Sequence, residues 1–585
     1  MDLEDENPKK SCCSKTRCSV IVLVGLLVSI AVVCVVTFVS DDVREKVQYD
    51  TSKLEWWKKT PVYQIYPISF KDTDDNGKGD INGITQKLPY LSELGVKAVW
   101  ISPFYDSPMN DNGYDIRNYT AINDLFGTMD DFEHLLKEAK SKDIKVIIDF
   151  VPNHSSNESQ WFIESENRTE GYEDFYVWVN GTEGTPPNNW KNNIGLSAWT
   201  WSNKRQQYYY HNYLAEQPDL NYRNPDVVAA MKEVLRFWLE KGVAGFRIDA
   251  VVHLFESESL QDQVEKDGQT VQNETVNLPE LFSVIEAWKM LINDYSNPPR
   301  VMFSEATTVD KDIIRKYYDA GTIPFNFDLV KQVNTTCDGI CLKDVIKDYT
   351  TILRSGDWPN FLTGSHDFSR VATRLGKEKA RAMAMLLLTL PGTPVIYYGE
   401  EIGMTDVSYT FAETQDTFGS RLGEDGYLNA TRDPERSPMQ WTSAVNAGFT
   451  NVSATPWLHL SSDSAQVNVE VEKNNTGGLL QLYKDLIKLR NYPSFETSTL
   501  EFAVVTNDVL SYIRKANGWQ MHLVVINLGS QEATNDFSRS PVFSTKGTIV
   551  VTTDSSFSVK QEVDLTNITI KPNQGVVIAV KYQKH

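Results

Sequence analysis

The sequence predicts an α/β protein: an eight-stranded parallel β/α barrel (TIM barrel) with a small domain inserted after the third strand, a C-terminal antiparallel β domain and one preceding transmembrane helix. Three observations lead to this class. Short apolar runs alternate with longer amphipathic ones along most of the chain, as parallel strands alternate with helices. Eight of the apolar runs have the length of a strand, and eight strands close a barrel. Near the C-terminus the helical runs stop, and alternating strands with turn residues follow.

The first element is an apolar segment, residues 19–40, that contains no charged residue until Asp41. At about 1.5 Å per residue a helix of this length reaches roughly 33 Å, enough to cross a hydrocarbon core of about 30 Å. A cleaved signal peptide is the alternative, but its apolar region spans only about 7–15 residues. Basic residues precede the segment: Lys9, Lys10, Lys15 and Arg17. We therefore expect a single-pass type II protein of the cell membrane, with residues 1–18 cytosolic, a stalk at 41–55 and the remainder extracellular.

Sequons and cysteines agree with an extracellular location. N-x-S/T sequons, which are candidate glycan sites, occur at Asn118, Asn167, Asn180, Asn273, Asn334, Asn451 and Asn567, among others. Four of the six cysteines precede the expected extracellular part: Cys12, Cys13, Cys18 and Cys34. Cys337 and Cys341 remain, and in an oxidising compartment they close a small disulfide loop or stay free. We expect the disulfide.

The barrel, the inserted domain and the C-terminal domain follow in order. The eight expected barrel strands are residues 62–66, 98–101, 145–150, 245–249, 301–304, 324–327, 361–364 and 394–398. A polar, aromatic stretch separates the third strand from the fourth and is too long for a simple connection, so we assign residues 151–221 to an inserted domain. The barrel then comprises residues 56–150 and 222–495, and the C-terminal β domain comprises 496–585.

The charge of the chain narrows the class of ligand. The formal net charge is -21, which repels phosphate backbones. Nucleic-acid binding is therefore excluded as an expected function, and a neutral substrate fits better.

Polar residues interrupt the apolar strands at their C-terminal ends: Asp149, Arg247 with Asp249, Glu305, and His366 with Asp367. In a β/α barrel these ends meet at one mouth, where active sites are built. A single carboxylate in such a place is usually a helix cap or a solvated acid. Because four strands carry polar residues at the same end, we expect one catalytic site.

The motifs around these residues are Asp149-Phe150-Val151-Pro152-Asn153-His154, Gly245-Phe246-Arg247-Ile248-Asp249-Ala250, Phe303-Ser304-Glu305-Ala306 and Ser365-His366-Asp367. With them the chain resembles the α-amylase family, glycoside hydrolase family thirteen. The resemblance implies that Asp249 is the nucleophile, Glu305 the general acid and base, and Asp367 the carboxylate that stabilises the transition state of a retaining hydrolysis. It also implies that His154 and His366 bind glucose hydroxyls. Arg247 lies two residues before Asp249 on a strand, so we expect it on the same face, keeping the nucleophile ionised.

The segment 217–221, Gln-Pro-Asp-Leu-Asn, resembles the exo-acting α-glucosidase branch of that family. In that branch an acid and an arginine bind the non-reducing end of glucose, and the resemblance assigns this role to Asp115 and Arg432. A surface salt bridge is the alternative. Tyr114, which precedes Asp115 in the same motif, is a further expected substrate-binding residue. Ala250 follows the nucleophile, and a small residue there implies α-1,4 bonds or sucrose in preference to α-1,6 bonds.

A loop after the first strand places oxygen donors at alternate positions, as in the first half of a calcium loop. It also resembles the calcium site of related α-glucosidases. The expected ligands are the side chains of Asp72, Asp74, Asn76 and Asp80 and the backbone carbonyl of Lys78. The ion would be structural, because two-carboxylate hydrolysis needs no metal. A metal-free acidic turn is the alternative.

These features predict a membrane-anchored α-glucosidase that releases glucose from short α-glucosides such as maltose or sucrose. The chain is also similar to the heavy subunits of heteromeric amino-acid transporters, which would make a transporter light chain its partner. Those subunits use an extracellular cysteine close to the membrane, and no cysteine lies between Cys34 and Cys337 here. They also tend to lack parts of the catalytic set, which is complete here. The sequence therefore favours the enzyme.

Overall fold

The computed structural model describes residues 49–580 except 267–268 and 271–272. The predicted cytosolic tail, the predicted transmembrane helix at 19–40 and most of the predicted stalk lie outside these residues. Within the described part of the chain, no helix combines the length and the apolar character needed to cross a bilayer.

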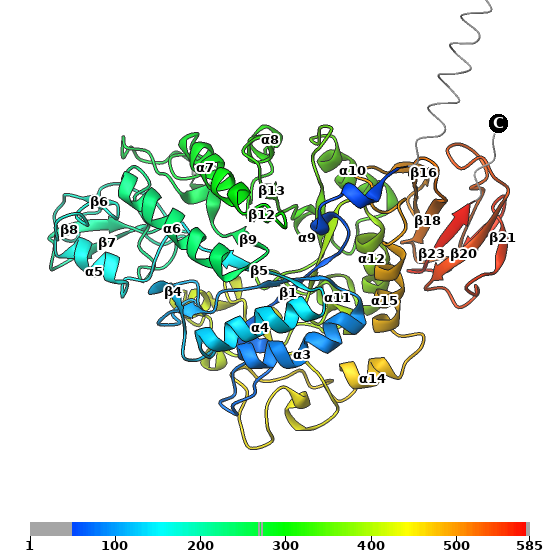
Figure 1. Cartoon of the computed structure of the whole chain (residues 1–585), viewed down its shortest axis with the longest axis horizontal. Helices are drawn as coiled ribbons and strands as arrows, with labels where there is room; N and C mark the ends of the chain where they lie inside the picture. The colour runs from blue at the N-terminus through cyan, green and yellow to red at the C-terminus, as the bar shows by residue number, and fades with distance from the viewer. Residues whose placement is uncertain (1–48, 267–268, 271–272, 581–585) are drawn as a thin grey trace, which may run out of the picture.

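The centre of the molecule is the predicted eight-stranded parallel barrel, in the order β13-β12-β9-β5-β2-β1-β15-β14 (Figure 1). Its strands are β1 Val62–Ile65, β2 Ala98–Ile101, β5 Lys145–Phe150, β9 Gly245–Ile248, β12 Val301–Ser304, β13 Ile323–Pro324, β14 Asn360–Leu362 and β15 Thr393–Tyr397. The side chain of Asn360 on β14 closes the barrel against β13, the strand at the other end of this order. It accepts from the Asn326 N–H at 2.9 Å and donates to the Pro324 carbonyl at 2.6 Å. The prediction of a TIM barrel is confirmed.

Helices surround the barrel (Figure 1). They are α2 Pro67–Phe70, α3 Ile81–Leu94, α4 Met129–Ser141, α6 Pro225–Lys241, α7 Glu280–Asp294, α8 Lys311–Asp319, α9 Asp328–Lys331, α10 Gly339–Thr350, α11 Val371–Leu375, α12 Lys377–Thr389, α13 Thr417–Arg421, α14 Val469–Lys473 and α15 Leu479–Leu489. Local sequence sets their ends. For α6, the Asn224 side chain accepts from the N–H of Asp226, Pro225 occupies the first turn, and Gly242 ends the helix at φ 99°.

The inserted domain lies at one end of the molecule, beside the barrel (Figure 1). It contains α5 Gln160–Glu166 and a sheet in the order β6-β8-β7, with β6 Trp178–Val179, β7 Trp199–Ser202 and β8 Gln207–Tyr210. Before it, β3 Tyr105–Asp106 and β4 Asn118–Ile122 form a hairpin, and after β9 a second short pair follows, β10 Glu265–Lys266 and β11 Gln269–Thr270. Aromatic rings form much of the inserted domain's core, so the aromatic residues of this stretch are structural: Trp190, Trp199, Tyr208 and Tyr210.

The C-terminal domain lies at the opposite end of the barrel from the inserted domain (Figure 1). Its main sheet is antiparallel in the order β16-β17-β18-β23-β20-β21, which confirms the predicted β domain. Its strands are β16 Glu501–Val505, β17 Val509–Arg514, β18 Met521–Asn527, β19 Ala533–Asn535, β20 Lys546–Thr552, β21 Glu562–Asp564, β22 Ile568–Ile570 and β23 Gly575–Val580. The expected bond between Cys337 and Cys341 is present at the start of α10.

Candidate active site

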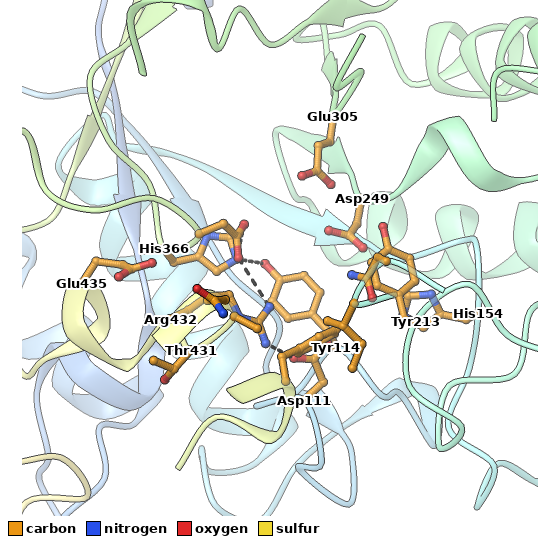
Figure 2. Close-up of a pocket in the computed structure, with 16 residues that line it drawn as sticks. Asp111, Tyr114, His154, Tyr213, Asp249, Glu305, His366, Thr431, Arg432 and Glu435 are labelled. Carbon is orange, nitrogen blue, oxygen red and sulfur yellow. Dashed lines mark hydrogen bonds and ion pairs between the residues drawn. The ribbon is translucent and has the colours of Figure 1, made fainter. Parts of the chain in front are cut away.

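A cavity of about 400 Å³ opens at the C-terminal ends of the barrel strands (Figure 2). Its lining combines barrel loops, the inserted domain and the long segment between β15 and α14: Asp111, Tyr114, His154, Asn193, Ile194, Tyr213, Asp249, Glu305, His366, Asp367, Phe418, Asn429, Ala430, Thr431, Arg432 and Glu435. All three predicted catalytic carboxylates are among these residues. Both predicted histidines, Tyr114 and Arg432 are there too.

Arg247 on β9 connects the two carboxylates that directly follow β9 and β12. Its guanidinium contacts Asp249, and its Nη2 lies 3.0 Å from an oxygen of Glu305. Asp149 on β5 pairs in register with Arg247 and lies 3.4 Å from the guanidinium. Only 2 % of the Arg247 side chain is exposed, so this one buried cation serves three carboxylates. The prediction that Arg247 lies on the same face as Asp249 is confirmed.

The pKa values in this cluster reflect burial as well as charge. Burial raises the pKa of Asp149 to about 6, against the opposing effect of Arg247. Burial and the neighbouring carboxylates likewise raise the pKa of Asp249 well above its ordinary value, although Arg247 acts to lower it. We expected Arg247 to keep Asp249 ionised. One guanidinium shared by three carboxylates only partly offsets the burial of Asp149 and Asp249 and the charge of their neighbours, so these two carboxyl groups bind a proton more readily than exposed aspartates do.

Asp367 lies in a different electrostatic environment. An oxygen of its carboxylate lies 2.9 Å from Arg436 and 3.5 Å from Arg432, and the other lies 3.3 Å from His366. Burial acts to raise its pKa, but His366, Arg436 and Arg432 together hold the pKa below its ordinary value. Asp367 is therefore ionised at neutral pH, whereas burial favours the protonated form of Asp249 and Asp149.

His366 is held in place from two sides. Its Nδ1 lies 2.7 Å from the amide nitrogen of Gln64 on β1, and its Nε2 lies 2.6 Å from the Tyr114 hydroxyl. Tyr114 also donates to Asp149 at 2.7 Å and stacks on the His366 ring. Burial lowers the pKa of His366 well below its ordinary value, so the ring is neutral. A neutral, fixed imidazole can bind a sugar hydroxyl without adding charge to the pocket.

Arg432 pairs with Asp111, and not with Asp115 as we predicted. Its Nη2 lies 2.7 Å from Asp111 (Figure 2). The Arg432 guanidinium also contacts both oxygens of Asp416. The Asp115 carboxylate instead accepts hydrogen bonds from the backbone N–H groups of Asn110 and Asp111 and from the Ser107 hydroxyl. Asp115 is fully buried and shapes the loop that presents Asp111. Asp115 does not line the pocket, and Asp111 occupies the position beside Arg432 that we had assigned to it.

The segment 217–221 positions two of these residues. The Gln217 amide donates to Asp111 at 3.0 Å and lies 3.1 Å from the His154 ring. Asp219 accepts from the Asn153 amide at 3.0 Å, which ties the end of the inserted domain to the loop after β5. Burial lowers the pKa of His154 to about 3, so this ring is neutral as well.

The predicted calcium loop brings three carboxylates together. Asp72, Asp74 and Asp80 offer oxygens that all lie within 4.8 Å of one another. The Asn76 side chain lies beside them and donates to Asp74 at 2.9 Å, while Lys78 follows in the same turn. Three acidic oxygens at this separation fit a hard divalent cation such as Ca²⁺.

Several lining residues escaped the sequence reasoning: Asp111, Asn193, Ile194, Tyr213, Phe418, Asn429, Ala430, Thr431 and Glu435. They lie on loops, on the inserted domain and on the segment between β15 and α14, where no strand or helix periodicity marks an inward face. For Asp111 one signal was available, because it lies only three residues before Tyr114.

Comparison with known proteins agrees with this geometry. The family described as "Alpha amylase, catalytic domain" matches residues 64–497. Maltase 1 of Drosophila virilis is 39% identical, over 90% of this chain and 87% of that protein. The amino acid transporter heavy chain SLC3A1 of Rattus norvegicus is 36% identical, over 90% of this chain and 78% of that protein. A mutant isomaltulose synthase of Erwinia rhapontici, solved in complex with its natural substrate sucrose, superposes with a TM-score of 0.83 at 30% identity, covering 91% of this chain and 100% of its own. The chain belongs to the α-amylase family, glycoside hydrolase family thirteen.

Proposed function

We propose that this protein is an exo-acting, retaining α-glucosidase that releases glucose from the non-reducing end of short α-glucosides. The observation that carries the proposal is the convergence of Asp249, Glu305 and Asp367 on one pocket whose wall also holds the Arg432–Asp111 pair. The pair offers several hydrogen-bonding positions to a neutral polyol. We assign it to the non-reducing end of the bound glucose.

The proposed reaction uses the two carboxylates that share Arg247. Asp249 attacks the anomeric carbon, the glycosidic bond breaks, and Glu305 donates a proton to the leaving oxygen. Glu305 then takes a proton from the water that hydrolyses the glycosyl–enzyme bond, and glucose leaves with its α configuration retained. Asp367 stabilises the positive charge that develops at the anomeric carbon in the transition state. Its lowered pKa supports this role, because the carboxylate stays ionised at neutral pH.

Maltose and sucrose are the proposed substrates. The similarity to a protein named maltase supports the first, and the similarity to an enzyme solved with its natural substrate sucrose supports the second. Ala250 supports α-1,4 bonds or sucrose over isomaltose, as the family resemblance implies.

The test uses the purified full-length protein with maltose, sucrose and isomaltose. We expect glucose release from maltose or sucrose, and proton NMR of the first product should show α-glucose. Asp249→Asn should lower the rate by a factor of about 10³ or more while its circular dichroism stays that of the wild type. Asp130→Asn, an exposed acid on α4, is the matched control and should keep full activity. β-Glucose as the first product would refute the retaining mechanism.

We also propose that Asp72, Asp74 and Asp80, with Asn76 and the Lys78 carbonyl, hold a structural Ca²⁺. Bound calcium would join the loop after β1 to the start of α3, because Asp80 caps that helix by accepting from the Gly83 N–H at 2.6 Å. Calcium should raise the melting temperature of the wild type and EDTA should lower it. Asp74→Asn should reduce that difference, and this variant suits the test because Asp74 is exposed. An equal calcium effect in both proteins would refute the site.

We further propose that residues 19–40 anchor the protein in the cell membrane with the catalytic domain outside. The apolar segment, the preceding basic residues and the sequons support this topology. On intact cells, an antibody to the C-terminal domain should bind without permeabilisation. Binding only after permeabilisation would reverse the topology.

A transporter heavy subunit is the second candidate, because the chain is similar to SLC3A1 of Rattus norvegicus. This interpretation makes a transporter light chain the partner. The assembled pocket favours the enzyme, and a folded, calcium-loaded protein that releases no glucose from any of the three sugars would favour the subunit.

A further inference from the structure

A glycosylation sequon lies in the wall of the catalytic pocket. Asn429-Ala430-Thr431 matches the N-x-S/T pattern, and all three residues line the cavity. Asn429 is the last residue of the 3₁₀ turn Tyr427–Asn429, in the segment between β15 and α14. The pocket wall itself thus contains a candidate modification site.

The Asn429 side chain is available for modification. Asn429 is exposed, and its backbone N–H donates to the Gly426 carbonyl at 3.0 Å, which holds the residue in its turn. Among the residues that the structure describes, nothing hydrogen-bonds its side-chain amide. A substituent on this nitrogen therefore breaks no internal hydrogen bond.

The surroundings place such a substituent at the entrance. Asn193 and Ile194 of the inserted domain line the same cavity, and Asn193 is exposed like Asn429. The inserted domain and the β15–α14 segment are also joined by an ion pair between Glu216 and Arg421. The entrance therefore lies between two parts of the chain that are held together, one of which carries the sequon.

We propose that Asn429 carries an N-linked glycan and that this glycan limits the entrance to short α-glucosides. The proposal rests on the proposed extracellular location and glucosidase activity. In the modification, the Asn429 amide nitrogen bonds to the anomeric carbon of a lipid-diphosphate-linked oligosaccharide. The bond from that carbon to the diphosphate oxygen breaks, the lipid diphosphate leaves and one amide proton is released.

The glycan discriminates between substrates by length because it is attached in the wall of the pocket entrance. A disaccharide lies within the pocket, whereas a longer chain continues past the entrance into the volume that the glycan occupies. The glycan weakens the binding of long substrates alone. The ratio of the kcat/KM value for a long substrate to that for a short one therefore measures its effect.

The first experiment is site occupancy in the full-length protein from a secretory eukaryotic host. Proteolytic peptides are treated with a peptide N-glycosidase in heavy-oxygen water. Removal of each glycan converts its asparagine to an aspartate that contains heavy oxygen, and mass spectrometry identifies the marked positions. We expect Asn429 to be marked, along with Asn567, an exposed sequon in the C-terminal domain. Marked Asn567 with unmarked Asn429 overturns the proposal. Absence of any marked sequon refutes the extracellular location instead.

The second experiment compares maltoheptaose with maltose. In Asn429→Gln the ratio of kcat/KM for maltoheptaose over maltose should rise by a factor of about three or more, equivalent to about 0.7 kcal/mol. Asn567→Gln is the matched control and should leave the ratio unchanged. Wild-type protein trimmed by endoglycosidase to single sugars provides the same test if Asn429→Gln does not fold. An unchanged ratio in glycan-free protein overturns the size limit, and a wild type inactive on both sugars refutes the proposed activity.

Discussion

At the scale of single residues, the site separates carboxylates by the arginines beside them. Asp367 has two arginines within 3.5 Å, as well as the neutral ring of His366, and its pKa is lowered. Asp249 shares one arginine with two other carboxylates, and its pKa is raised. The pKa values of two buried aspartates thus shift in opposite directions because the number of arginines beside each differs.

The exchange of Asp115 for Asp111 gives a prediction at this scale. Asp111→Asn should lower kcat/KM by a factor of about 10² with little change in melting temperature, because it removes the charge that faces Arg432 in the pocket. Asp115→Asn should lower the melting temperature, because a neutral amide cannot accept all the hydrogen bonds that converge on this buried carboxylate. Steady-state kinetics and thermal unfolding of the two variants test this, and the reverse pattern would return the binding role to Asp115.

At the scale of elements, the 3₁₀ turn Glu400–Ile402, which follows β15, contains two buried acids. Neither forms an ion pair within the part of the chain that the structure describes. Glu401 accepts from the hydroxyls of Tyr63 and Tyr90, at 2.7 and 2.6 Å. Glu400 accepts from the Thr363 hydroxyl at 3.1 Å, and burial raises its pKa to about 7. The turn is therefore most stable when Glu400 is protonated.

Glu400 gives a pH prediction. Its pKa is raised in the folded protein, so its stabilising effect is complete below its unfolded pKa of about 4.3 and disappears as the pH rises towards about 7. Glu400→Gln stays neutral throughout. Between pH 5 and pH 8 the free energy of unfolding of the wild type should fall more than that of Glu400→Gln, by about 2 kcal/mol.

Urea unfolding at both pH values measures this difference. Glu424→Gln, an exposed substitution in the segment between β15 and α14, is the control and should follow the wild type. Parallel curves for the wild type and Glu400→Gln would contradict the assignment.

At the scale of the whole molecule, the barrel is joined to an inserted domain at one end and a β domain at the other (Figure 1). A buried arginine secures the second junction. Arg514, the last residue of β17, donates to the carbonyls of Thr389, Phe495 and Thr497 at 2.7, 3.2 and 2.8 Å. Thr389 ends α12, so its carbonyl lacks a partner within the helix and attracts a cation.

Replacing this arginine should weaken the junction. Arg514→Met keeps much of the volume but leaves three buried carbonyls without donors, so the free energy of unfolding should fall by about 2–4 kcal/mol. Lys515→Met changes the next residue, which has a side chain 60% exposed, and should change it by less than about 0.5 kcal/mol. Chemical unfolding followed by tryptophan fluorescence measures both, and equal effects would show that Arg514 does not secure the domains.

By itself, the sequence determined the barrel, the C-terminal sheet and the convergence of Asp249, Glu305 and Asp367. The reason is that strand periodicity locates strand ends, and in a parallel barrel all those ends meet at one mouth. Only the tertiary structure decided that Arg432 pairs with Asp111. Asp115 lies four residues further along the same irregular loop, where no periodicity tells an inward side chain from an outward one. The path of the backbone determines which acid faces the pocket. The loop folds around Asp115, whose carboxylate accepts hydrogen bonds from the N–H groups of the same loop.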